Sequence, residues 1–301
     1  MTLQDPEVSD LLTPSNFLAL PPELSSFTNS EFVLIPVPYN GTTTYRTGAR
    51  LGPQAIIQAS HELEDFDPEL EWEPSSLGIH TADQVSPHSG GPKWMVERVE
   101  KVTGHYLDAG KRIGLLGGEH SIAIGSISAA RKRFSDLSVL YLDAHADFRE
   151  SYQESRFSHA CTARRVREIC PIILAGVRST SSEEFADLTN MKVSVFPRKS
   201  EPLQEQDHQD IIQLLSSHVY ISIDTDVLDP SLVPSVGNPE PGGMGWWELL
   251  GLLRAVASSC KIVGFDVTEL SPQRYQDTSA YVMAKLVYKL ISYSLFHQAP
   301  R

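Results

Sequence analysis

Val139-Leu140-Tyr141-Leu142-Asp143-Ala144-His145-Ala146-Asp147 is an apolar, strand-like run that ends abruptly in two aspartates and a histidine at alternating positions. In an extended chain, alternate residues point to the same side, so Asp143, His145 and Asp147 can converge on one point. Two carboxylates and an imidazole brought together attract a cation. For this motif alone, a metal site and a polar loop after a strand are equally acceptable interpretations, because a single short motif is weak evidence.

Two further strand ends carry side chains of the same kind. The apolar run 219–223 leads into Asp224-Thr225-Asp226, and the run 112–116 opens into Gly117-Gly118-Glu119-His120-Ser121. Parallel α/β sheets place their active sites where the carboxyl ends of the strands meet, so one crevice is expected to collect these residues. The candidate metal ligands are His120, Asp143, His145, Asp147, Asp224 and Asp226. Four carboxylates and two imidazoles favour two hard or borderline divalent ions, which can activate a shared water for hydrolysis.

Composition excludes several classes of protein. The net charge is −13, and no basic cluster is longer than Arg131-Lys132-Arg133, which argues against a nucleic-acid partner. The three cysteines lack metal-binding spacing and are typical of reduced thiols in the cytoplasm. Segment 1–7 does not resemble a signal peptide, and no apolar run approaches the ~20 residues of a membrane helix. We therefore expect a soluble cytoplasmic protein without a membrane partner.

Apolar runs alternate with helical patterns along the chain, which predicts a parallel sheet covered on both faces. About eight strands are expected, at 32–37, 76–80, 112–116, 139–142, 172–176, 193–196, 219–223 and 262–265. Helices are expected from Pro53 to about Leu63 and at 93–109, 122–134, 160–169, 182–188, 210–215, 246–258 and 279–296. Residues 1–30 are expected to form an N-terminal arm, and residues 31–301 a single catalytic domain. Eight strands also suit a TIM barrel, which the pattern alone leaves open.

Three segments, 117–121, 143–147 and 222–230, resemble in this order the signature motifs of the ureohydrolases, the family of arginase, agmatinase and formimidoylglutamase. The likeness runs from about Phe32 to the carboxyl end, and segments 38–43 and 238–243 are most similar to the agmatinase branch. The resemblance implies an arginase-like α/β/α sandwich, an open three-layer α/β fold with a mainly parallel sheet of about eight strands. It also implies two Mn²⁺ per chain, a small cationic guanidino substrate, and a homo-oligomer, trimeric or hexameric.

The resemblance also implies roles for residues outside the metal motifs. Glu269 would hold the guanidinium through paired charge-assisted hydrogen bonds, while a metal-bridging hydroxide attacks the guanidinium carbon. Asp147 would relay a proton to the departing amine, and His159 would assist, since the pKa of histidine lies near working pH. Asn238 would lie beside the substrate. The alternatives are a solvated glutamate at Glu269 and a histidine without chemistry at His159.

The main functional hypothesis is hydrolysis of agmatine to putrescine and urea. Guanidinobutyrate or arginine is the alternative substrate, and a non-catalytic regulatory homologue is a third interpretation. Loop 148–158 carries charges of both signs, so composition does not decide between an amine and an acid tail. For agmatine we expect Arg149 to point away from the tail and pair with an acid, and Glu150 or Glu154 to attract the ammonium. Glu119 stands where the commonest family motif has aspartate.

Overall fold

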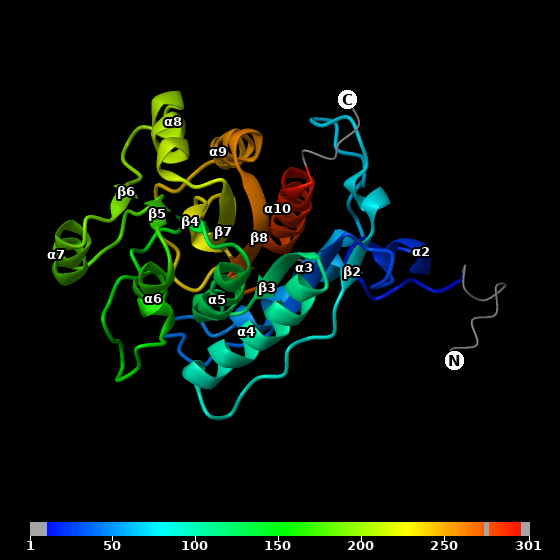
Figure 1. The fold of residues 1–301 in the computed structure, drawn as a ribbon, viewed down its shortest axis with the longest axis horizontal. Coiled ribbons are helices and arrows are strands. Elements are labelled where there is room, and N and C mark those ends of the chain that lie inside the picture. The colour runs from blue at the N-terminus through cyan, green and yellow to red at the C-terminus, as the bar shows by residue number, and fades with distance from the viewer. Residues whose placement is uncertain (1–10, 274–276, 296–301) are drawn as a thin grey trace.

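The computed structural model describes residues 11–273 and 277–295 (Figure 1). Its centre is one sheet of eight parallel strands, in the order β2-β1-β3-β8-β7-β4-β5-β6. The strands are β1 (Phe32–Val37), β2 (Ile79–Thr81), β3 (Arg112–Gly117), β4 (Ser138–Leu142), β5 (Ile172–Ala175), β6 (Ser194–Phe196), β7 (His218–Asp224) and β8 (Lys261–Thr268). Because β2 and β6 are not paired with each other, the sheet is open. The predicted eight-stranded sandwich is confirmed, and the barrel alternative is wrong.

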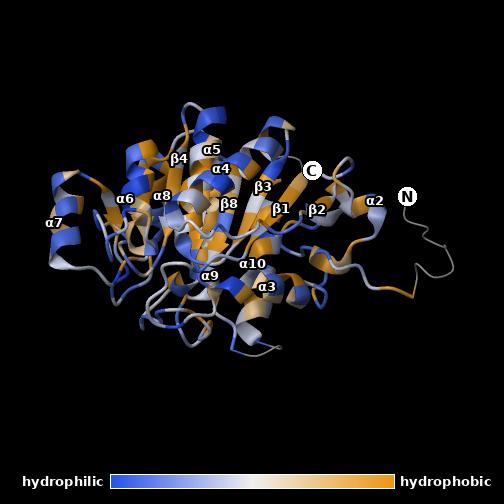
Figure 2. Ribbon diagram, turned by 90° about the horizontal axis from the view of Figure 1, so that it is seen from below, coloured by the Kyte–Doolittle hydropathy of each residue, from blue (hydrophilic) through white to orange (hydrophobic). Residues whose placement is uncertain are grey.

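Helices cover both faces of this sheet (Figure 2). They are α2 (Pro22–Ser25), α3 (Gly52–Ser60), α4 (Pro92–Asp108), α5 (Ala123–Arg133), α6 (Thr162–Ile169), α7 (Ser182–Asn190), α8 (Glu205–Leu214), α9 (Trp246–Ser259) and α10 (Thr278–Ser294). One core layer packs α3, α9 and α10 against the sheet, and a second packs α4, α5 and α6. Alternate residues of β1 supply the two layers: Phe32 and Leu34 lie in the first, Val33 and Ile35 in the second.

Short 3₁₀ helices occur at several loop starts: η1 (Phe17–Ala19), η2 (Ala49–Leu51), η3 (Pro74–Leu77), η4 (His120–Ile122), η5 (His159–Cys161) and η6 (Thr225–Val227). Within residues 11–30, η1 packs against α3 through the fully buried Phe17, whereas α2 contacts β2 and η3. The backbone N–H of Leu18 also donates to Ser60 Oγ at 2.8 Å. No helix in the described part of the chain is long and apolar enough to cross a membrane.

The predicted elements differ from the structure mainly at their ends. Helix α8 begins at Glu205, five residues before the predicted start. Its first turn is polar and gives no apolar period, but Asp207 caps it by accepting the N–H of Gln204 at 2.7 Å. The predicted helix 160–169 begins at Thr162, because residues 159–161 form η5. Residue 296, the predicted end of the last helix, lies outside the described residues.

Candidate metal centre

Strands β3, β8, β7 and β4 are consecutive neighbours in the middle of the sheet. All are parallel, so their carboxyl ends lie at the same edge, where such sheets bind ligands. His120 follows β3, Asp143 follows β4, Asp226 follows β7, and Glu269 follows β8. The sheet order therefore brings together side chains that are far apart in the sequence.

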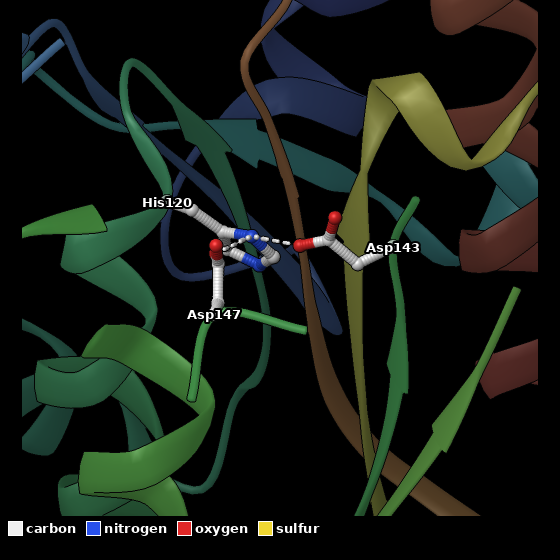
Figure 3. Close-up of side chains that lie close together, drawn as sticks. All are labelled: His120, Asp143 and Asp147. Carbon is white, nitrogen blue, oxygen red and sulfur yellow. Dashed lines mark hydrogen bonds and ion pairs between the residues drawn. The ribbon is translucent and has the colours of Figure 1, made fainter. Parts of the chain in front are cut away.

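Asp143 lies at the centre of these side chains. Its Oδ2 atom is 3.1 Å from His120 Nδ1, and its Oδ1 atom is 3.6 Å from His145 Nδ1. Two groups of mutually close ligand atoms share it, one with His120 and Asp147 and the other with His145 and Asp226. Figure 3 shows the first group, with both carboxylates directed at the imidazole. Either group offers the three ligand atoms from which a metal site is built.

The remaining predicted ligand completes this arrangement. Asp224 Oδ2 is 3.4 Å from His120 Nδ1, the same ring nitrogen that faces Asp143. In the second group, His145 Nδ1 is 2.9 Å from Asp226 Oδ2. All six predicted ligands thus lie around Asp143, which touches both groups.

The convergence of Asp143, His145 and Asp147 has a different cause from the predicted one. Strand β4 ends at Leu142, and Asp147 has φ +46°, a left-handed conformation that is uncommon for a residue other than glycine. The chain therefore turns sharply at Asp147 rather than continuing in an extended form. Such backbone conformations persist where the surrounding structure enforces them, which is frequent at functional sites.

The carboxylates repel one another strongly in this buried place. Burial and then the charge of Asp143 raise the pKa of Asp147 and of Asp226, and burial, Asp226 and Asp143 raise that of Asp224. Burial acts in the same direction on Asp143, but hydrogen bonds with His120 and His145 outweigh it and lower its pKa. A divalent cation would relieve this repulsion and stabilise the ionised forms. Oxygen and imidazole donors without sulfur fit a hard or borderline divalent metal.

Two residues that contact His120 were missed by sequence reasoning. The hydroxyl of Tyr141 lies 2.9 Å from His120 Nδ1 and donates to Asp147 Oδ2 at 3.0 Å. On the opposite edge of the ring, His120 Nε2 is 2.9 Å from Ser222 Oγ. Both stand two positions before an aspartate on a strand, so the two-residue period of a strand points them to the same side. That two-residue spacing could have identified Tyr141 and Ser222 from the sequence.

Glu269 lies beside the metal ligands and lines the crevice above them. Its Oε1 atom accepts the backbone N–H of His120 at 2.8 Å, and its own backbone has φ +63°. Burial, followed by the charge of Glu119, raises the pKa of Glu269 to about 8. A cation placed next to this carboxyl would favour the charged form.

His159 and Asn238 also line this crevice, which has a volume of about 310 Å³. His159 begins η5, and burial lowers its pKa to about 4, so the imidazole is neutral at neutral pH. Its Nδ1 atom lies 3.1 Å from the hydroxyl of Thr42, in the loop after β1. Asn238 comes from a different part of the chain, the long loop between η6 and α9. Seven of the nine predicted site residues line this crevice, and the other two, His120 and Asp143, are fully buried beside it.

Loop 148–158 contributes Arg149 and Tyr152 to the crevice. As expected, Arg149 pairs with an acid: its Nη2 atom is 3.8 Å from Glu184 Oε2, and its guanidinium lies 5.2 Å from the ring centre of Tyr152. The expectation for Glu150 is wrong. Its carboxylate is bound by three arginines, at 2.8 Å from Arg156, 3.2 Å from Arg164 and 3.0 Å from Arg165.

Glu154, the other acid that we expected to attract an ammonium, is not among the residues that line the crevice. The acid of this region that does line it is Glu184, near the start of α7. Glu184 already accepts hydrogen bonds from the N–H groups of Phe148 and Ser181, each at 3.0 Å. Neither predicted acid of loop 148–158 is therefore placed to meet a ligand in the crevice.

Comparison with known proteins gives consistent matches over most of the chain. The model of the Arginase family matches residues 30–292. The N(1)-aminopropylagmatine ureohydrolase of Thermus thermophilus is 37% identical over 271 residues, covering 88% of this chain and 90% of that protein. The agmatinase of Pyrococcus horikoshii is 34% identical over 275 residues, covering 88% of this chain and 93% of that protein. The solved agmatine ureohydrolase of Thermoplasma volcanium has a TM-score of 0.83 at 28% identity, covering 98% of this chain and 100% of that one.

Proposed function

Because the chain belongs to the arginase family, we propose that it hydrolyses the guanidino group of agmatine, releasing putrescine and urea. The observation that carries this proposal is the crevice itself, where the six candidate metal ligands gather beside the carboxylate of Glu269. A relative named N(1)-aminopropylagmatine ureohydrolase makes the aminopropyl derivative of agmatine the second candidate. Both candidates combine a guanidinium with an amine tail.

We propose that two Mn²⁺ ions bind here. His120, Asp147 and Asp224 would hold one, His145 and Asp226 the other, with Asp143 shared between them. A bound pair of such ions lowers the pKa of a shared water and so supplies a nucleophile at neutral pH.

Glu269 is proposed to bind the guanidinium. One of its oxygens already accepts the backbone N–H of His120, which fixes the direction of the carboxylate. A planar guanidinium can donate two parallel N–H groups to a carboxylate, which orients its central carbon as well as holding it. A bound guanidinium would favour the ionised form of the buried Glu269 carboxyl, and the ionised carboxylate in turn binds the guanidinium more tightly.

Asp147 and His159 are proposed to move protons. The carboxylate of Asp147 lines the crevice beside Glu269, so it is placed to accept a proton there and pass it to the departing amine nitrogen. His159 is neutral and lies in the same crevice, where its imidazole can accept a proton from the reacting groups and give it up again to solvent.

The contacts of Arg149 support a substrate with an amine tail, such as agmatine. This is a guanidinium at the crevice wall, and it is engaged by Glu184 and by the ring of Tyr152. A carboxylate tail would have to compete with Glu184 for it. Asn238 is proposed to contact the substrate through its amide, which suits either a donor or an acceptor.

The test is urea release by manganese-loaded protein from four compounds: agmatine, N¹-aminopropylagmatine, guanidinobutyrate and arginine. We expect turnover of agmatine at a kcat/KM well above that of both acids. Preference for N¹-aminopropylagmatine over agmatine would establish the second candidate. Release from an acid but not from agmatine, or no release from any of the four, would contradict the proposal.

A further inference from the structure

Glu119 is a fully buried carboxylate that the proposed chemistry does not use. Its Oε1 atom accepts the hydroxyls of Ser121 at 2.6 Å and of Thr42 at 2.8 Å, and its Oε2 atom accepts the backbone N–H of Thr42. Donors thus surround both oxygens, so the carboxylate acts as an acceptor throughout. Thr42 lies 77 positions away in the sequence, so these hydrogen bonds connect the loop after β1 to the loop after β3.

The hydroxyl of Thr42 continues this chain of hydrogen bonds to His159. It has one proton and two lone pairs, and the proton is donated to Glu119. One lone pair accepts the backbone N–H of His159 at 3.0 Å, and the other faces His159 Nδ1 at 3.1 Å. An unprotonated Nδ1 would present its own lone pair to that of the hydroxyl, which is repulsive. This contact therefore favours a proton on Nδ1.

Among the described residues, Ser158 offers a competing hydroxyl, since its Oγ atom lies 3.4 Å from His159 Nδ1. A hydroxyl proton donated from Ser158 would favour the opposite tautomer. That distance is beyond the usual range for a hydroxyl donor, whereas Thr42 lies within reach. The geometry favours Thr42.

We propose that Glu119 and Thr42 position His159 and fix its neutral ring as the Nδ1–H tautomer, leaving the Nε2 lone pair free to accept a proton in the crevice. A neutral imidazole has one donor and one acceptor nitrogen, and the partner of one nitrogen decides the role of the other. Glutamate at 119, one methylene longer than the aspartate of the commonest family motif, is the residue that makes this contact here. The use of the tautomer in proton transfer rests on the proposed function, but the tautomer itself does not.

The tautomer can be read directly by long-range ¹H–¹⁵N correlation spectra of protein labelled in histidine. The protein is loaded with diamagnetic Mg²⁺ or Zn²⁺, and the His159 signals are identified by their loss in His159→Gln. We expect the Nδ1–H form in the wild type and in Thr42→Ser, and a shift toward Nε2–H in Thr42→Val. Thr103→Val is the matched control, because Thr103 is fully buried on α4 and its hydroxyl has no hydrogen-bond partner among the described residues.

Kinetics give a second readout. General acid–base catalysis contributes roughly 10²–10⁴-fold, so Thr42→Val should lower kcat about tenfold or more, with KM within a few-fold. Thr42→Ser and Thr103→Val should stay near wild type. An Nε2–H tautomer in the wild type, an unchanged tautomer in Thr42→Val, or equal losses in Thr42→Ser and Thr42→Val would overturn the proposal. Failure of the proposed function would show separately, as absence of urea release with the Nδ1–H tautomer still present.

Discussion

At the scale of single residues, Asp143 contributes one carboxylate oxygen to each half of the proposed metal centre. Asp143→Ala should therefore reduce bound manganese to well below one ion per chain, measured by elemental analysis after dialysis. Asp226 belongs to one group only, so Asp226→Ala should keep about one ion. Two ions retained in Asp143→Ala, or none in Asp226→Ala, would contradict this division of the site.

Glu269 is expected to matter for turnover rather than for metal content. In Glu269→Gln the backbone N–H of His120 can still be accepted by the amide oxygen, but the charge that holds a guanidinium is lost. Losing a hydrogen bond between charged groups costs ~1.5–3 kcal/mol, which is roughly a ten- to hundredfold fall in kcat/KM. Manganese content should remain at the wild-type level. The exposed Glu183→Gln on α7 is the control, and near-wild-type turnover in Glu269→Gln would remove this residue from the site.

Arg149 is expected to be nearly dispensable for an amine substrate. Its contact with Glu184 is 3.8 Å long and its side chain is 36% exposed, and such ion pairs contribute ~0–1 kcal/mol. Arg149→Ala should leave kcat/KM for agmatine within a few-fold of wild type. If Arg149 instead binds a substrate carboxylate, the same change would raise KM for guanidinobutyrate roughly tenfold or more. Parallel KM measurements on both compounds distinguish the two outcomes.

At the scale of elements, a buried ion pair fastens α10 to the loop before η3. Lys289 Nζ lies 2.9 Å from Asp67 Oδ2 and also contacts Glu69, and both Lys289 and Asp67 are almost completely buried. Removing one partner of a buried pair typically costs ~3–5 kcal/mol, because the other charge is left unpaired. Lys289→Met should lower the free energy of unfolding by about that amount in urea titrations. The double variant Lys289→Met, Asp67→Asn should recover part of the loss, and full stability of the single variant would contradict the argument.

The elements that could be predicted from sequence are those with a strong apolar pattern. Strands β4 and β7 are apolar runs followed by aspartates, and both strands and these candidate metal ligands were predicted. Contacts between charged or polar groups that are distant in sequence were not predicted. The three arginines on Glu150 and the bond from Thr42 to Glu119 depend on how loops fold back, which has no period in the sequence. The left-handed turn at Asp147 likewise follows from its surroundings rather than from residue preference.

At the scale of the whole molecule, the proposed metals should stabilise the fold by mass action. A ligand that binds only the folded chain adds ~2.7 kcal/mol at a concentration one hundred times its Kd. For a chain of this size, this corresponds to a rise in Tm of about 5 °C for one site. Thermal unfolding with manganese and with a chelator measures the difference. The shift should vanish in Asp143→Ala, and an equal shift there would mean that the metal acts elsewhere.

The distribution of the proposed ligands along the chain bears on how the protein is made. They come from three chain segments, beginning at His120, Asp143 and Asp224. Strands β4 and β7 pair directly, but β3 reaches β7 only through β8 near the carboxyl end. A ribosome-bound chain that has not yet exposed residues 261–268 lacks the strand that joins β3 to β7. The proposed ion held by His120 would therefore need β8 in the sheet, whereas the ion held by His145 and Asp226 would need only β4 and β7, so the two halves of the site would become available at different stages of synthesis.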